Sequence, residues 1–207
     1  QIYQEVLRMG ALVEDSLLEV VNGEDEEVVR RTALASLGFS GREEVTSLIQ
    51  SAYDSNDTNW VSTALFAMGR SGNERWNDQV TAMFGSQHPL IREEAARAAG
   101  ELMIEDAVDP LLDLSEDDND EVRLAAIWSL SQIGGEGVRE HLQNLAKSTD
   151  DDDEVDLIEA ALDNLSFTEE VDQFALFDLD AEEQYLVKVL GRGGVLRTPS
   201  GVRYAIP

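Results

Sequence analysis

The sequence predicts an all-α protein: a right-handed α-solenoid of about five to six helix pairs, followed by a short C-terminal tail without the repeat. Three observations lead to this fold class. A pattern recurs with a 31-residue period, each copy carries apolar residues at helical spacing, and most copies follow an acidic or asparagine-rich turn. One such unit cannot bury its apolar stripe alone, so successive units must stack on one another.

The first helix of each unit is recognised by copies that align without a gap. Its first, fifth and ninth residues fall on one stripe of a 3.6-residue helix. The four aligned copies begin at Val29, Trp60, Ile91 and Val122. The fifth residue is always alanine, which lets a neighbouring helix approach closely. A fifth copy occupies residues 155–164, and a partial copy before the others ends at Gly10.

The tenth position of the repeat is small in all four aligned copies, where it reads Gly38, Gly69, Gly100 and Ser131. Glycine is the usual residue for a left-handed helix C-cap, so we expect the first helices to end at these glycines. The second helix follows the turn, and its apolar positions repeat with the same step, beginning with Val45, Trp76, Ala107 and Val138. Each unit is therefore a helix, a short turn, a second helix and an acidic turn.

The chain is strongly acidic, with 43 aspartate and glutamate residues against 15 lysine and arginine residues and a formal net charge of −28. This charge repels phosphate backbones and anionic lipid surfaces, so we expect neither nucleic acid nor a membrane as partner. The turns before the first helices should lie along one edge of the solenoid, where they would attract a basic segment. The acidic edge comprises Asp25, Glu26, Asp57, Asp118, Asp120, Asp151 and Asp152. Solubility alone is the alternative explanation of the charge.

The stretch 118–126, an acidic turn followed by Val-Arg and two alanines, resembles the short HEAT-like repeats of bacteria, including those of phycobilisome lyases. The second-helix stretch 104–112 shows the same likeness, and the resemblance covers roughly residues 1–165. It implies the fold but not one function, since this repeat serves many roles. It also implies an Asp–Arg ladder between repeats, built on Arg30, Arg92 and Arg123 and interrupted at Val61 and Asp156.

The two ends differ from the repeat. We expect a solenoid over residues 1–178, closed by a helix that starts at Thr168, and a capping helix with a basic tail over residues 179–207. A helix over 181–190 and a small hairpin over 195–204 are predicted within that tail, which should contact something acidic. The first unit is truncated, so we expect the natural protein to extend further at the N-terminus.

No catalytic residue, metal site or cofactor is predicted. The chain has no cysteine and two histidines, of which His88 reads as a surface turn residue and His141 as half-buried packing. We expect no serine or threonine beside a histidine. The acidic clusters 117–120 and 150–153 lack the glycine and glutamate of an EF-hand loop, so no calcium site is expected there. The glycines of 191–194 follow a predicted helix rather than a strand, which is not the pattern of a phosphate-binding loop. No run of eighteen apolar residues occurs, and a cytoplasmic location is the default.

A partner is expected on the second helices, because we expect these to line the concave side of the solenoid and the first helices to form the convex side. The second-helix residues that point away from the stripe are Thr46, Ser47, Gln50, Asn77, Asp78, Thr81, Asp109, Leu112, Arg139, Glu140 and Gln143. Phe66 and Trp128 are expected to be exposed on the convex side, whereas Trp60 and Trp76 belong to the core.

The favoured function is a non-catalytic scaffold or adaptor that binds a protein or peptide of basic character, through the concave face or the acidic edge. The resemblance implies one alternative, a lyase- or chaperone-like subunit that acts on a chromophore protein. The residues themselves show no chromophore site.

Overall fold

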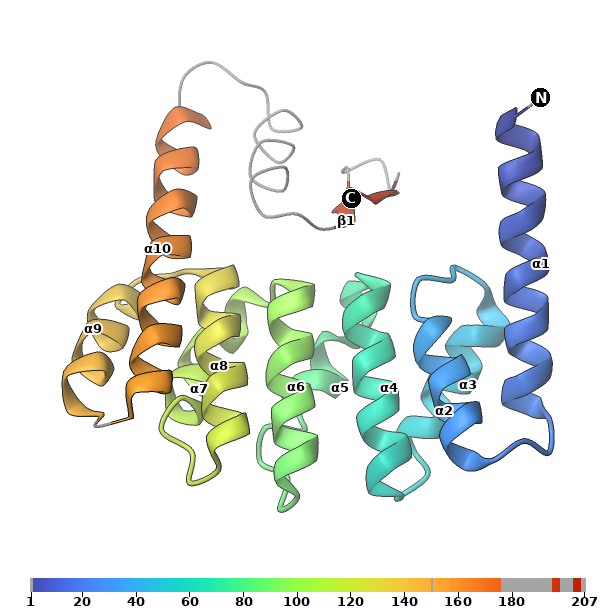
Figure 1. Cartoon of the computed structure of the whole chain (residues 1–207), viewed down its shortest axis with the longest axis horizontal. Helices are drawn as coiled ribbons and strands as arrows, with labels where there is room; N and C mark the ends of the chain where they lie inside the picture. The colour runs from blue at the N-terminus through green and yellow to red at the C-terminus, as the bar shows by residue number, and fades with distance from the viewer. Residues whose placement is uncertain (1, 150, 176–194, 198–202, 206–207) are drawn as a thin grey trace.

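A computed structural model describes residues 2–149, 151–175, 195–197 and 203–205. The described residues confirm the α-solenoid, in which helices alternate between two layers (Figure 1). The first layer holds α2 (Glu27–Ser36), α4 (Thr58–Ser71), α6 (Pro89–Leu102), α8 (Asp120–Ile133) and α10 (Asp152–Ala175). The second holds α3 (Glu43–Tyr53), α5 (Asn77–Thr81), α7 (Val108–Leu114) and α9 (Val138–Ser148), and the 3-10 turns η1 (Glu74–Trp76) and η2 (Glu105–Ala107) precede α5 and α7.

The ends of the solenoid are single helices. α1 (Ile2–Asn22) runs through Gly10 without a break, so the expectation that a first helix ends there is wrong. Glycine in a helix costs about 1 kcal/mol relative to alanine, too little to end a helix of this length. α10 likewise continues through Thr168, where a separate closing helix was expected.

The tail is described only at a hairpin, in which β1 (Val195–Arg197) pairs antiparallel with β2 (Arg203–Ala205) and Leu196 lies opposite Tyr204. The expected hairpin is therefore confirmed at its two strands. The helix expected over 181–190 lies outside the described residues. None of the described helices has the length and apolar content needed to cross a membrane.

One hydrophobic core runs between the two layers along the whole array. The repeat position held by Leu34, Leu65, Ala96 and Ile127 is completely buried, as is the second-layer position of Val45, Ala107 and Val138. Trp76 is 3% exposed and belongs to this core, as expected. Trp60 packs against the core from its edge, with the Arg30 guanidinium 5.5 Å from the centre of its ring.

The glycines of the repeat do not cap their helices. Gly69 and Gly100 lie inside α4 and α6, and the left-handed residues that end these helices are Gly72 and Met103, at φ 55° and 54°. The glycines instead mark close approach between helices. A Cβ added to Gly69 would lie 3.0 Å from Ala98 Cα, and one added to Gly100 would lie 2.6 Å from Ser129 Oγ. The expected C-cap role is therefore wrong, because helix–helix contact is what requires a residue without a side chain here.

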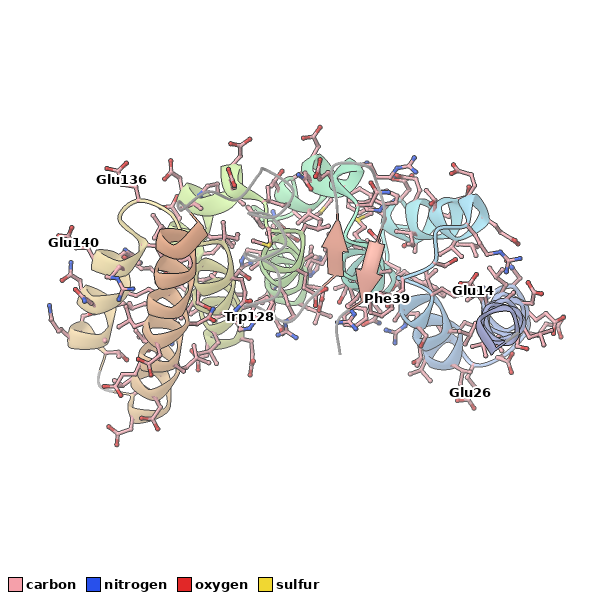
Figure 2. The ribbon with its side chains drawn as sticks, turned by 90° about the horizontal axis from the view of Figure 1, so that it is seen from above. Glu14, Glu26, Phe39, Trp128, Glu136 and Glu140 are labelled. Atoms are coloured by element: carbon pink, nitrogen blue, oxygen red, sulfur yellow. The ribbon has the colours of Figure 1, made fainter. Side chains whose placement is uncertain are left out.

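The first-layer helices form the inner row of a curved array. α6 packs directly on both α4 and α8, and the Ser129 hydroxyl donates to Ala96 O across the α6–α8 contact at 2.7 Å. The second-layer helices carry bulkier residues and barely touch one another. Closely spaced helices must lie on the inside of a curve, and seen from above the array bends with α3, α5 and α7 on its outer side (Figure 2). The expected assignment of the concave side to the second helices is therefore wrong.

Candidate functional site

Two arginines tie successive turns together. Arg92 donates from Nε and Nη2 to both carboxylate oxygens of Asp117 at 2.8 Å, and Arg123 donates from Nε to Glu154 Oε1 at 2.9 Å. Each also donates to a backbone carbonyl six residues earlier, Ser86 O or Asp117 O. The Asp–Arg ladder implied by the resemblance is thus present at Arg92, whereas at Arg123 a glutamate takes the place of the aspartate.

This ladder shifts the titration of its carboxylates. The hydrogen bond from Arg92 lowers the pKa of Asp117. Burial raises the pKa of Glu154, but hydrogen bonds from Thr149 and Arg123 outweigh it and lower the pKa overall. Arg30 breaks the pattern, because it donates to Val21 O at 2.9 Å and stacks over Trp60. Asp117 and Glu154 are therefore structural residues of the turns.

The turns that precede α2, α4, α6, α8 and α10 all lie along one edge of the solenoid (Figure 1). Part of the acidic edge has a local structural role. Asp57 is the N-cap of α4 and accepts from the amides of Asn59 and Trp60, and Asp120 lies 3.0 Å from Arg123. Asp25, Glu26, Asp118, Asp151 and Asp152 are exposed, so the negative charge of the edge faces solvent.

The second-helix residues expected at the partner surface lie on the outer side of the array. The structure leaves them half-buried or exposed, and several hydroxyls bond within their own helices: Thr46 to Arg42 O, Ser47 to Glu43 O and Thr81 to Asn77 O. Their placement on the concave face is wrong because the first helices pack more closely than the second. This correction applies to Thr46, Ser47, Gln50, Asn77, Asp78, Thr81, Asp109, Leu112, Arg139, Glu140 and Gln143.

One serine does lie beside a histidine, contrary to expectation. Ser115 Oγ is 2.7 Å from His141 Nε2, and the serine hydroxyl also donates to Leu112 O at 2.7 Å. Since the hydroxyl proton is used on Leu112, the imidazole must donate to the serine oxygen and cannot act as its base. Ser115 is fully buried, so this contact links α7 to α9 rather than forming a nucleophile. His141 is half-buried packing, as expected, and exposed His88 precedes Pro89 at the start of α6.

Within the described residues, no group of three or more histidine, aspartate or glutamate side chains is placed to hold a metal ion.

The inner face carries exposed aromatic side chains. Phe66 and Trp128 are 36% and 38% exposed, as expected from the sequence, but they lie on the inner side and not the outer. Phe39, which sequence reasoning missed, is 52% exposed just after α2. Arg70 lies over the Phe39 ring at 4.4 Å and 3.9 Å from Glu101, so one line of contacts crosses α2, α4 and α6. The Trp128 ring covers Gly100, where an added Cβ would lie 2.8 Å from it.

Three glutamates and two arginines complete this surface, which we call the inner-face strip: Phe39, Phe66, Arg70, Glu93, Glu94, Arg97, Glu101 and Trp128. Arg97 pairs with Glu93 at 2.8 Å, and Arg70 with Glu101. Burial raises the pKa of Glu101, although Arg70 and Arg97 oppose the shift. Burial also raises the pKa of Glu94, to about 7. The strip was missed because the sequence reasoning assigned the two layers to the wrong sides.

A signal for the correct layers was present in the sequence. The six consecutive residues of α6 from Ala95 to Gly100 are only alanine, glycine and one arginine, whereas the second helices carry valine, leucine and tryptophan at most of their buried positions. Small residues allow closer helix spacing, and the row with the smaller spacing must curve inward.

Comparison with known proteins agrees with this architecture. Residues 77–163 match the family model described as HEAT repeats. No curated protein matches the chain significantly. The matched segment comprises α5 to α9 and the first turns of α10, and the same alternation of layers continues before it. The chain is therefore similar to HEAT-repeat proteins over residues 77–163.

Proposed function

We propose that the chain is a non-catalytic scaffold that binds a protein partner through a basic segment of that partner. HEAT repeats generally mediate contacts between proteins, which supports a protein ligand. The observation that carries the basic character is the charge left over after internal pairing. Among the described residues, five arginines lie within 3.3 Å of a carboxylate of the chain itself, in the pairs Arg31–Glu27, Arg42–Asp15, Arg92–Asp117, Arg97–Glu93 and Arg123–Glu154.

These pairs occupy five of the fifteen lysine and arginine side chains, and the acidic residues outnumber the basic ones 43 to 15. The surface consequently keeps a large excess of unpaired carboxylates. The exposed turn carboxylates supply attraction that reaches about 8 Å at physiological salt, the screening length. The aromatic side chains of the inner face supply apolar contact area. Tryptophan, tyrosine and phenylalanine are enriched at protein interfaces for this reason. We assign long-range attraction to the acidic edge and close contact to the inner face.

Capture from a native lysate tests the proposal. Immobilised full-length chain is exposed to lysate at about 0.05 M and about 0.5 M salt, together with a Phe66→Ser/Trp128→Ser variant and, as control, a Glu140→Gln variant of the outer layer. We expect basic proteins that bind at low salt, are lost at high salt, and are lost from the double variant but not from the control. Capture of mainly acidic proteins, or capture insensitive to salt, would contradict the proposal.

The same experiment addresses the alternative implied by the resemblance, a lyase- or chaperone-like role. A chromophore protein among the captured species would be detected by its visible absorbance and would favour that alternative over a general scaffold.

A further inference from the structure

We infer that the inner-face surface between α4 and α6 receives a lysine or arginine side chain of an extended basic segment, with Glu94 pairing the charge and Phe66 lying against the aliphatic stem. This inference rests on the proposed function and names the contact site within it.

The position of Glu94 follows from the helix stripe to which it belongs. Glu94, Ala98 and Glu101 follow one another at helical spacing on α6. Ala98 approaches Gly69 of α4, and Glu101 reaches Arg70 of α4. Glu94 therefore lies on the side of α6 that faces α4, one turn before the Ala98 contact. Phe66 is on α4, one turn before Arg70, so Glu94 and Phe66 border the same stretch of the contact between α4 and α6.

The charges of the strip leave Glu94 without a countercharge of its own. The strip has three carboxylates, of Glu93, Glu94 and Glu101, and only two guanidinium groups, so one carboxylate is in excess. Arg97 is paired with Glu93, and Arg70 with Glu101 and the Phe39 ring. Within the described part of the chain, Glu94 has no hydrogen bond or ion pair; Arg97 attracts it only at longer range.

A half-buried carboxylate without a partner is costly, and a cation from another molecule would offset that cost. Phe66 is 36% exposed beside it and offers a ring face and edge to the methylene groups of a lysine or to a guanidinium group. A lysine or arginine combines these two requirements, a positive end group and an apolar stem, and an acidic or neutral side chain does not.

Binding at this site should be coupled to the loss of a proton from Glu94. Burial raises the pKa of Glu94 to about 7, against the attraction of Arg97 and with the repulsion of Glu93 and Glu101. The charged group that faces it from α4 is Arg70, and on the other side of α6 the Trp128 ring of α8 covers Gly100. About half of the Glu94 side chains therefore carry a proton at pH 7, and a bound cation, which favours the ionised form, releases it. Affinity should rise as the pH rises from about 6 to 8.

Acetylated deca-lysine amide serves as the probe for calorimetric titration of the full chain at pH 7 and low salt. Two buffers of different ionisation enthalpy report the protons released. We expect release of about 0.5 proton per bound peptide from wild type. The Glu94→Gln variant should release almost none and bind about fivefold to tenfold more weakly. The control Glu140→Gln removes one exposed carboxylate from α9 and should change affinity less than twofold.

Each contrary result points to a different error. If Glu94→Gln binds as tightly as wild type while salt still abolishes binding, the contact site is wrongly assigned and the basic-partner function stands. If wild type does not bind deca-lysine even at low salt, the proposed function itself fails. If zero-length carbodiimide treatment of the free chain joins Lys188 to Glu94, the occupant is the basic tail of this chain, and the inference of a partner segment is overturned.

Discussion

Replacing Glu94 by glutamine should stabilise the protein at pH 8 and have little effect at pH 4.5. Burial raises the pKa of Glu94 from 4.5 to about 7, so the folded chain holds a proton on this group at pH values where the unfolded chain has lost it. A raised folded-state pKa means that the favourable contribution is complete below about 4.5 and is lost as the pH rises to about 7. Above that pH, the folded chain must ionise a poorly solvated carboxylate.

The size of the effect follows from the shift. A difference of about 2.5 pKa units corresponds to about 3.4 kcal/mol at 1.36 kcal/mol per unit. Because Glu94 is half-buried and not fully enclosed, solvent screening reduces this value, and we expect about 1–2 kcal/mol. The neutral amide fills the same volume without the charge, so the variant keeps this free energy at every pH.

Urea unfolding of wild type and Glu94→Gln at pH 4.5, 6, 7 and 8, followed by far-UV circular dichroism, measures the effect. The difference in unfolding free energy should be near zero at pH 4.5 and grow to about 1–2 kcal/mol in favour of the variant at pH 8. Glu105→Gln, which removes an exposed carboxylate from η2, corrects for the general loss of self-repulsion. A difference between Glu94→Gln and this control that stays constant from pH 4.5 to 8 would refute the assignment of a buried, proton-linked carboxylate.

Three further predictions concern packing and charge. Gly100→Ala should lower the unfolding free energy by about 1–3 kcal/mol, because its Cβ would lie 2.6 Å from Ser129 Oγ and 2.9 Å from the Ser129 backbone. Gly10→Ala has nothing within 4 Å of its Cβ, so it should be neutral or raise the unfolding free energy by up to about 1 kcal/mol. Equal effects of the two variants in thermal melts would contradict the close approach at Gly100. Asp117→Asn should lower the unfolding free energy by about 1–3 kcal/mol at pH 7, because it removes the ion pair with Arg92. This difference should shrink below about pH 4, where wild-type Asp117 also loses its charge and its lowered pKa no longer stabilises the fold. A difference that does not change with pH in urea unfolding would argue against this role of the pair. Added salt up to physiological strength should raise the melting temperature, since it screens repulsion along the acidic edge, and a salt-independent melting temperature would show that this repulsion is negligible.

The helices and the core were predictable because they depend on local spacing. Leu34, Leu65, Ala96 and Ile127 recur every 31 residues, and all four are buried. The glycine of the repeat was misread because glycine serves two purposes, a left-handed turn and a close helix contact. A single sequence does not separate them. The helices end three residues later at Gly72 and Met103, and a left-handed methionine has no sequence signature.

Contacts between units were predictable in principle from a fixed offset. The Tyr53 hydroxyl donates to Gln79 O, and Ser115 meets His141; both pairs are 26 residues apart. Arg92 meets Asp117 at almost the same separation, 25 residues. Reading the second helix of one unit against the next at this offset would have placed Ser115 beside His141. No offset provides the charge state of Glu94, because its desolvation depends on how closely the neighbouring side chains enclose it.

The variation within the repeat separates residues that the fold requires from residues that it leaves free. The position held by Ala33, Ala64, Ala95 and Ala126 is alanine in every copy and almost completely buried, because a larger side chain there would push adjacent helices apart. The repeat position two residues further along the same helices is occupied by Ala35, Phe66, Arg97 and Trp128. This position faces the inner surface, where packing sets no volume and tolerates a methyl group, a guanidinium group and an indole alike. Packing alone therefore does not fix the residue type at this position, although the Trp128 ring does cover Gly100. Phe66 and Trp128 keep 36% and 38% of their surface exposed, and the contact with a partner that we propose would cover this remaining area.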